Sequence, residues 1–343
     1  TIIIHLYLLR CRVKDFYITY LYFERGPSCS SHYYRIVKAQ RLVLNLSSEH
    51  KIWDNRQVKP MRYDEPLIIA KHMNLLPKIA AIQMTSCSSI ETNLATAARL
   101  LKQAADDGAS LAVLPEMFST LAVENGTLDA AETFGNGPLQ QFLATQAQQH
   151  HMWIVGGTIA IKSEHDKKAY AACLVYDHQG KLIARYNKMH LFDACLEHDK
   201  EVYRESENIL HGDTPVVFDS PLGKIGLAVC YDLRFAELFH CLSQQGADIF
   251  IIPSAFTYNT GLAHWEILCR ARAIENLAYV IAADQSGEHT KQRRSYGHSM
   301  IVDPWGKILC QVEQNEGVLC QAIDLQQVTQ ARKKLPVLEH RKL

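Results

Sequence analysis

The segment GLAVCYDLRF (Gly226–Phe235) joins a short apolar stretch to a polar, charged stretch that is compatible with a helix. The pattern predicts a buried strand that ends on Cys230, followed by a turn that lifts the thiol toward solvent. In α/β folds, clefts form at the carboxyl ends of strands. Cys230 is therefore a candidate functional residue.

From Lys78 onward, short apolar segments alternate with amphipathic ones, which is typical of a layered α/β fold. Helices are predicted over residues 88–109, 138–151, 234–247 and 263–277. Strands are predicted over 78–84, 110–116, 152–160, 169–177, 181–188, 215–219, 223–230, 248–254, 278–284, 297–304, 306–313 and 317–324. Residues 189–214 read as a long polar loop. Residues 78–343 are thus predicted to form one domain.

The first 77 residues differ, since they show no sustained periodicity and contain 12 Lys and Arg against 6 Asp and Glu. We favour the interpretation that these residues are an upstream extension included by a wrongly assigned start site and lie outside the catalytic fold. Met73 would then be the first residue of the protein. The alternative is a small basic appendage with a partner of its own, such as a nucleic acid.

The whole-chain composition points to a soluble protein whose function lies in a local site. Lys plus Arg and Asp plus Glu are equal at 36 each, so no global field favours nucleic acid or a membrane surface. No apolar run approaches the roughly 20 residues that span a bilayer, and the opening TIIIHLYLLR makes a poor signal peptide. We therefore predict a cytoplasmic location, with neither membrane nor nucleic acid as partner.

The ten cysteines are scattered without a C-x-x-C pair, which favours reduced thiols over disulfides or a zinc site. His190, His198 and His211 also fit no zinc-ligand spacing. We expect no metal and no organic cofactor.

Three segments each place a reactive side chain at or just past the end of a predicted strand: AVLPEMF with Glu116, RYNKMHLFD with Lys188, and LAVCYDLRF with Cys230. A neighbouring cation and the amides that open a helix favour a thiolate, so Lys188 and the helix from about Arg234 are expected to activate Cys230. Lys188 and the amide of Tyr231 could hold an oxyanion. Glu116 could move protons to the leaving group and from water.

These roles do not follow from spacing, since the three residues are 72 and 42 positions apart. Glu116 could equally be a carboxylate at a helix N-terminus, Lys188 a solvated residue at a strand end, and Cys230 a core residue.

The three blocks LAVLPEMF, RYNKMHLFD and GLAVCYDLRFAEL resemble, in order, the signatures of the nitrilase superfamily of carbon-nitrogen hydrolases over residues 78–340. The resemblance implies a four-layer α-β-β-α sandwich, usually a homodimer, with Glu116 as general base, Lys188 as transition-state-stabilising lysine and Cys230 as nucleophile. YRESENILHGD resembles a further motif and implies that Glu205 orients the lysine or the substrate amide. His211 replaces the proline that is usual there.

Within the superfamily, the segments 253–276, 284–306 and 333–342 look most like the deaminated glutathione amidase branch. This implies a cysteine-dependent amidase that hydrolyses a small 2-oxo-acid amide in metabolite repair, through a thioester and with release of ammonia. The alternatives are an omega-amidase, an N-carbamoyl amino-acid hydrolase, a nitrilase, or an inactive scaffold member.

An anionic substrate calls for cations near the cleft. Arg234, and either Arg293 or Arg294, are the candidates, with surface salt bridges as the alternative interpretation. Further predicted substrate-binding residues follow strand ends or the nucleophile, and core packing is their alternative role: Tyr231, Phe118, Phe192, Ser254 and Phe256.

Overall fold

The computed structural model describes residues 6–12, 15–25, 34–43 and 76–342, except 124–125, 166 and 197–200. The chain divides into two compact units, Thr1–Leu75 and Leu76–Leu343. In the first unit, β1 (Leu6–Arg12), β2 (Asp15–Arg25) and β3 (Tyr34–Val43) form an antiparallel sheet in that order. Met73 lies outside the described residues, and the role of residues 1–77 stays a prediction.

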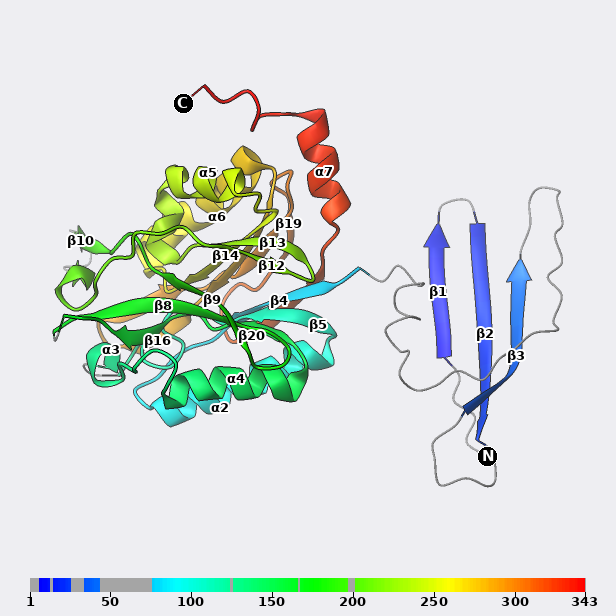
Figure 1. The fold of residues 1–343 in the computed structure, drawn as a ribbon, viewed down its shortest axis with the longest axis horizontal. Helices are drawn as coiled ribbons and strands as arrows, with labels where there is room; N and C mark the ends of the chain where they lie inside the picture. The colour runs from blue at the N-terminus through cyan, green and yellow to red at the C-terminus, as the bar shows by residue number, and fades with distance from the viewer. Residues whose placement is uncertain are drawn as a thin grey trace. The chain divides into compact units, whose positions relative to one another are not determined.

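The second unit contains two mixed sheets (Figure 1). The strands of the first sheet are, in spatial order, β20 (Gly317–Ala322), β4 (Lys78–Gln83), β5 (Ala109–Val113), β6 (Trp153–Val155), β8 (Ala169–Tyr176) and β7 (Ile159–Lys162), with β9 (Leu182–Asn187) also paired to β8. The strands of the second sheet are β12 (Val217–Ser220), β13 (Gly223–Leu227), β14 (Ile249–Ser254), β15 (Tyr279–Asp284), β18 (Met300–Val302) and β19 (Ile308–Gln311). In each sheet three consecutive strands run parallel: β4–β5–β6 and β13–β14–β15.

Helices cover the outer face of each sheet. Figure 1 shows α2 (Ile90–Asp106) and α4 (Pro138–His150) on one side of the unit, and α5 (Ala236–Gln244) and α6 (Tyr258–Asn276) on the other. Along β4, Ile79 and Ala81 belong to the core shared by the two sheets, whereas Ala80 and Ile82 belong to the core under α2 and α4. This alternation, which follows from the two-residue period of a strand, confirms the predicted α-β-β-α sandwich.

Local sequence accounts for the helices of the first layer. Ser89 caps α2 by accepting a hydrogen bond from the amide of Thr92 at 3.2 Å. The buried residues of α2 follow the spacing of one helical face: Asn93, Ala97, Leu100, Leu101 and Ala104. In α4, Pro138 occupies the first turn, where a missing N–H leaves no bond unmade.

Several elements were not predicted from the sequence. The polar stretch 189–214 contains the hairpin of β10 (Asp193–Leu196) and β11 (Glu201–Arg204) and a 3₁₀ turn, Glu205–Glu207. A second hairpin joins β16 (Ser286–Thr290) to β17 (Arg293–Tyr296), and helix α7 spans Leu325–Lys334. Strands of four or five residues are too short for a period-two pattern to stand out from their neighbours. Both hairpins lie beside the candidate site.

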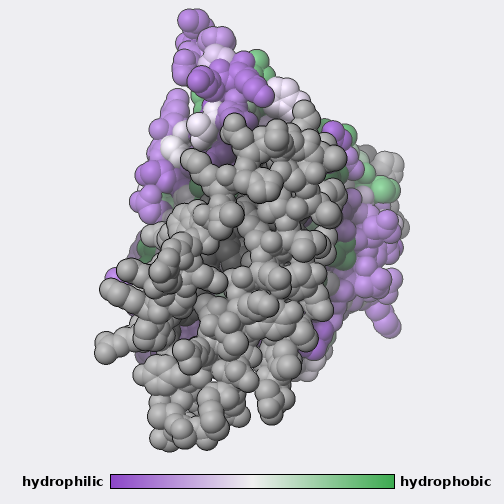
Figure 2. All heavy atoms as spheres, turned by 90° about the vertical axis from the view of Figure 1, so that its right-hand side faces the viewer, coloured by the Kyte–Doolittle hydropathy of each residue, from purple (hydrophilic) through white to green (hydrophobic). Residues whose placement is uncertain are grey.

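Helix α7 lies outside the four layers of the sandwich and is largely polar. Val328 and Ala331 are buried, and Arg332, Lys333 and Lys334 lie in its last turn. Figure 2 shows hydrophilic side chains gathered at the top of the viewed face, where α7 and the C-terminal segment lie. Of the helices that are described, none has the length and the apolar character that a membrane-spanning helix needs.

Candidate active site

Glu116 lies three residues beyond β5 and is 4% exposed. Its main chain is held on both sides: the carbonyl accepts a hydrogen bond from Gln285 Nε2 at 3.1 Å, and the next amide, that of Met117, donates to Thr158 Oγ1 at 3.0 Å. Gly157 makes the close approach possible, because a Cβ there would overlap the carbonyl oxygen of Pro115. The tight packing fixes where the Glu116 carboxylate points.

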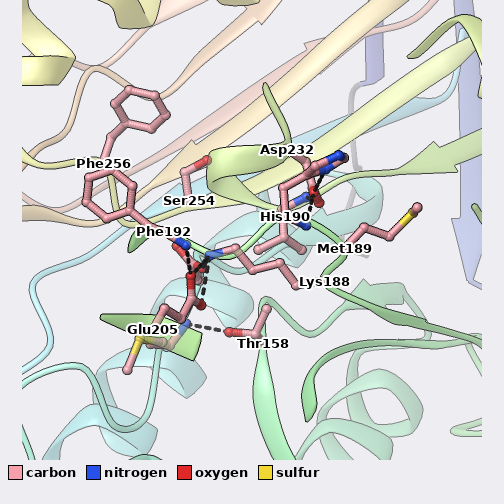
Figure 3. A network of polar contacts seen from close by, with 12 residues as sticks. Thr158, Lys188, Met189, His190, Phe192, Glu205, Asp232, Ser254 and Phe256 are labelled. Atoms are coloured by element: carbon pink, nitrogen blue, oxygen red, sulfur yellow. Dashed lines mark hydrogen bonds and ion pairs between the residues drawn. The ribbon is translucent and has the colours of Figure 1, made fainter. Parts of the chain in front are cut away.

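Lys188 directly follows β9, and its side chain is 2% exposed. Its Nζ lies 2.8 Å from Glu116 Oε1, and 2.9 and 2.8 Å from the two oxygens of Glu205. Glu205 opens the 3₁₀ turn after β11 and also accepts a hydrogen bond from the Phe192 amide at 2.7 Å. Figure 3 shows Lys188 reaching toward Glu205. The structure thus brings together three charged residues that are far apart in the chain.

Cys230 lies three residues beyond β13, rather than on the last residue of a strand as predicted, and opens a 3₁₀ turn, Cys230–Arg234. Its φ of 46° lies in the left-handed region, which side-chain-bearing residues rarely occupy. Such strain is found where a sharp turn must aim a side chain, as at the strand-to-helix turn that carries the serine of α/β-hydrolases. The residue is 8% exposed.

The charges of this cluster act on one another strongly. Burial alone would lower the pKa of Lys188, but Glu116 and Glu205 outweigh it and raise this pKa well above its usual range. The lysine therefore stays protonated. It can donate hydrogen bonds and stabilise negative charge, but it is unsuited to act as a base.

Burial raises the pKa of the Cys230 thiol well above its usual range, and the nearby Glu116 raises it further. Lys188 and the Ala255 amide oppose this shift without reversing it. Lys188 thus favours the thiolate, as expected from the sequence, but local reasoning counted neither the burial of the sulfur nor the carboxylate of Glu116, which act in the opposite direction. A thiol whose pKa is raised forms a thiolate more readily when a base lies beside it.

A cavity of about 260 Å³ opens in front of these groups. Its lining includes Glu116, Lys188, Glu205 and Cys230, together with the predicted Phe192 and Arg293. A smaller hollow of about 20 Å³ also borders Cys230 and is lined by the predicted Tyr231, Arg234 and Phe256. Phe192, Cys230 and Ala255 border both.

Two predicted substrate-binding residues line neither hollow. Phe118 is fully buried and stacks on Phe142 with ring centroids 6.2 Å apart. Ser254 is also fully buried, and its hydroxyl lies 3.4 Å from the Ile252 carbonyl. Their surroundings are those of core residues.

Asp232, two residues after Cys230, was missed by the sequence analysis. It is fully buried, and its Oδ2 accepts hydrogen bonds from the Val229 amide at 2.8 Å and the Tyr186 hydroxyl at 2.7 Å. Its Oδ1 lies 3.0 Å from the amide nitrogen and 2.7 Å from Nδ1 of His190. Asp232 thereby ties the turn at Cys230 to the segment that follows Lys188. The only signal in the sequence was an acidic residue directly after an apolar strand.

No three His, Cys, Asp or Glu residues within the described part of the chain form a group that could hold a metal ion. Two of the histidines considered above have other contacts, His190 with Asp232 and His211 Nδ1 with the Gly212 carbonyl at 3.0 Å. His198 lies outside the described residues.

Comparison with known proteins extends this picture. Residues 78–333 match the family model described as carbon-nitrogen hydrolase. A deaminated glutathione amidase of Synechocystis sp. is 40% identical over 265 residues, which is 76% of this chain and 97% of that protein. A Homo sapiens protein of the same name is 40% identical over 274 residues, 78% of this chain and 83% of that one.

Solved structures agree with the sequence comparisons. Saccharomyces cerevisiae Nit3, a member of branch 10 of the nitrilase superfamily, superposes with a TM-score of 0.70 at 30% identity, covering 78% of this chain and 97% of that one. The Caenorhabditis elegans NitFhit protein superposes with a TM-score of 0.72 at 38% identity, covering 78% of this chain and 65% of that one. With its sandwich fold and the family match over residues 78–333, this chain belongs to the carbon-nitrogen hydrolase family of the nitrilase superfamily and is a hydrolase of carbon-nitrogen bonds other than peptide bonds.

Proposed function

We propose that this protein is an amidase that hydrolyses a 2-oxo-acid amide such as deaminated glutathione, with Cys230 as the nucleophile. The observation that carries the proposal is the meeting of Glu116, Lys188 and Cys230 at one cavity. The relatives named deaminated glutathione amidase support the choice of substrate.

In the first step, Glu116 takes the proton of the Cys230 thiol while the sulfur attacks the amide carbon. The carbon-sulfur bond forms, and the carbonyl electron pair moves onto oxygen. Lys188 Nζ, with the Tyr231 amide as a second donor, stabilises this oxyanion. Before the step, Lys188, Glu116 and Glu205 carry one net negative charge. When Glu116 accepts the proton, these three residues become neutral while the negative charge moves to the substrate oxygen.

In the second step, the oxyanion collapses and the carbon-nitrogen bond breaks. Glu116 returns its proton to the leaving nitrogen, which leaves a thioester on Cys230. Glu116 then takes a proton from water as the water oxygen attacks the thioester carbon. When the carbon-sulfur bond breaks, Glu116 passes this proton to the sulfur, which restores the thiol and releases the acid. Glu205 holds Lys188 with both oxygens throughout, which keeps the ammonium aimed at the oxyanion.

The leaving group depends on the substrate. Release of ammonia, expected above, applies to a primary amide such as 2-oxoglutaramate. Hydrolysis of deaminated glutathione to 2-oxoglutarate releases cysteinylglycine instead, because the amide nitrogen belongs to that dipeptide. Formation of 2-oxoglutarate is the readout that the two substrates share.

The test is a substrate panel combined with mass spectrometry of the intact protein. Deaminated glutathione, 2-oxoglutaramate, an N-carbamoyl amino acid and a nitrile are assayed side by side, and the acyl-enzyme is trapped by rapid acid quench. We expect 2-oxoglutarate from deaminated glutathione and a 2-oxoglutaryl adduct on Cys230. Cys230→Ala should lower kcat by about 10³-fold or more.

Cys195→Ala is the matched control, since Cys195 is an exposed thiol on β10. This variant should keep wild-type activity. Undiminished turnover by Cys230→Ala, or an adduct on another cysteine, would show that the nucleophile is wrongly assigned. Turnover of the nitrile or the carbamoyl compound alone would replace the proposed substrate.

The homodimer and the cytoplasmic location stay predictions. A feature that supports an interface is the outer face of α6, where Leu262, Ile267 and Ile274 are 64%, 69% and 47% exposed. Trp305, in the turn before β19, is 64% exposed. Such exposed apolar residues are commonly covered by a partner.

A further inference from the structure

Arg293 and Arg294 are neighbours on β17, but they lie on opposite faces of the strand. Arg293 shares its face with Ser295, which is 2% exposed and hydrogen-bonded to His289 Nε2 at 2.9 Å. The Arg294 guanidinium is instead placed over the Tyr258 ring, 3.7 Å from its centroid. Of the two, only Arg293 lines the cavity in front of Cys230. The structure therefore separates two candidates that the sequence left equivalent.

β17 is fixed against the loop that borders Cys230. The Tyr296 amide donates to the Phe256 carbonyl at 2.9 Å, and Thr257 and Ser295 form an isolated antiparallel bridge. Arg293 thus projects into the cavity from a hairpin that is anchored to the active-site wall.

Arg293 lines the cavity from β17. No carboxylate within the described part of the chain forms an ion pair with it, and its guanidinium lies 5.7 Å from the centroid of the Tyr203 ring. Arg204 also lines the cavity, but it pairs with Glu207 at 3.2 Å. A partly buried guanidinium with free donors favours a planar anion, above all a carboxylate that it can bind with two parallel hydrogen bonds.

The position of Glu116 places the leaving amine in the cavity that Arg293 also lines. Glu116 must lie next to the leaving nitrogen in order to protonate it. It borders the 260 Å³ cavity, which also contains Arg293, and not the 20 Å³ hollow beside Arg234. The leaving amine therefore lies in the same cavity as Arg293.

We propose that Arg293 binds a carboxylate carried by the leaving amine, so that the enzyme selects amides whose amine half is a peptide or amino acid with a free carboxyl group. The inference rests on the proposed function and narrows its substrate class. A dipeptide extends over roughly 7 Å, a length compatible with a cavity of about 260 Å³.

The test crosses three enzymes with three substrates. The enzymes are wild type, Arg293→Gln and Arg294→Gln. The substrates are deaminated glutathione, the same compound with its glycine carboxylate converted to a primary amide, and 2-oxoglutaramate, whose leaving group is ammonia. All three are followed by the 2-oxoglutarate formed.

For the wild type we expect kcat/KM to be about 10- to 100-fold higher on deaminated glutathione than on its glycinamide form, the effect of a charge-assisted hydrogen-bonded pair. Arg293→Gln should remove this preference by raising KM for deaminated glutathione. Its kcat/KM on the other two substrates should stay within about twofold of the wild-type values. Arg293→Lys should restore part of it. Arg294→Gln should behave as wild type.

An equal loss on all three substrates, or an equal effect of Arg294→Gln, would overturn the proposal. If the wild type forms no 2-oxoglutarate, the proposed function fails, and Arg293 is then tested by binding. Calorimetry with cysteinylglycine and cysteinylglycinamide should show tighter binding of the free carboxylate to wild type and no difference in Arg293→Gln. Equal affinities for wild type would reject the assignment in that case also.

Discussion

Two buried carboxylate centres lie along the segment that carries Lys188, and they are built differently. At the first, one ammonium holds Glu116 and Glu205, and the group borders the cavity. At the second, Asp232 has no access to solvent and is surrounded by donors from Val229, Tyr186 and His190. Figure 3 shows Asp232 and His190 together, away from Glu205.

The difference suggests that the first centre takes part in the reaction and that the second holds the neighbouring segments in position. The first centre can exchange a proton with a substrate, because one ammonium faces two carboxylates and the charges balance when one carboxylate gains a proton. The second centre is satisfied by hydrogen bonds from neighbouring groups and has nothing to exchange. Breaking the first should therefore affect both catalysis and stability strongly, whereas weakening the second should displace Cys230 without changing the acid-base chemistry.

The largest effect is expected from Lys188→Met, which removes the only cation that the structure shows bound to Glu116 and Glu205. Two carboxylates then remain buried without a cation, and we expect a loss of about 3–5 kcal/mol in the free energy of unfolding at pH 7. Activity should fall by about 10³-fold or more, since the oxyanion loses its charged donor. Urea unfolding and steady-state kinetics measure the two effects.

The same variant has a pH signature. A carboxyl group left buried without a cation has a folded-state pKa above its unfolded value, so it contributes stability at low pH and loses it as the pH rises. The deficit of Lys188→Met relative to wild type should therefore shrink as the pH is lowered from 7 toward 5. Lys181→Met, at an exposed position before β9, is the control. A deficit that stays constant with pH would contradict the charge argument.

Asp232→Asn should have a smaller effect. Asparagine keeps the shape but replaces one acceptor oxygen with a donor, so that two of the groups around it face an NH₂ group. We expect a loss of about 2–3 kcal/mol and a kcat about tenfold lower, with an unchanged pH midpoint of kcat. Slower alkylation of Cys230 by iodoacetamide would report the displaced sulfur.

Tyr186→Phe removes one donor to Asp232 and leaves the carboxylate intact, so it should have the same effects in weaker form. A shift in the pH midpoint of kcat in Asp232→Asn would show that Asp232 takes part in the acid-base chemistry. The proposed difference between the two centres would then be wrong.

Local patterns were sufficient to place Glu116, Lys188 and Cys230 at the ends of strands and to predict the layered fold, because both depend on the period of apolar residues. They could not show that the three meet, since chain separation carries no information on distance. The resemblance of whole blocks to a known family supplied that expectation. The role of Glu205 was also predicted from the family resemblance, although its stretch of sequence was expected to be a loop.

Other features depend on packing that no local pattern encodes. The pKa of Cys230 depends on its burial and on a carboxylate 114 positions earlier in the chain. Asp232 matters because four donors from two segments, residues 186–190 and Val229, point at it. Arg293 and Arg294 are distinguished only by the register of a strand of four residues that the sequence did not predict.

The smallest effect is expected at His289, which can change charge and is connected to the Glu116 main chain through Ser86 and Gln285. Its Nδ1 lies 2.9 Å from the Ser86 carbonyl, which can only accept, so Nδ1 carries the proton and Nε2 accepts from Ser295. Burial lowers the pKa of His289 from its usual 6.5 to about 4.

The unfolded chain therefore binds more protons than the folded one between these two values, and stability is lost as the pH falls below about 6.5. We expect His289 to contribute almost nothing to the pH dependence near pH 7 and to destabilise the protein by about 1–2 kcal/mol at pH 5. In His289→Gln the difference in unfolding free energy between pH 7 and pH 5 should shrink by that amount, whereas in His178→Gln, at an exposed turn, it should stay as in wild type. If His289→Gln lowered kcat on deaminated glutathione as much as Asp232→Asn does, the His289 network would also position the active-site residues. The location of a buried polar network outside the cavity lining would then not show that it has no effect on catalysis.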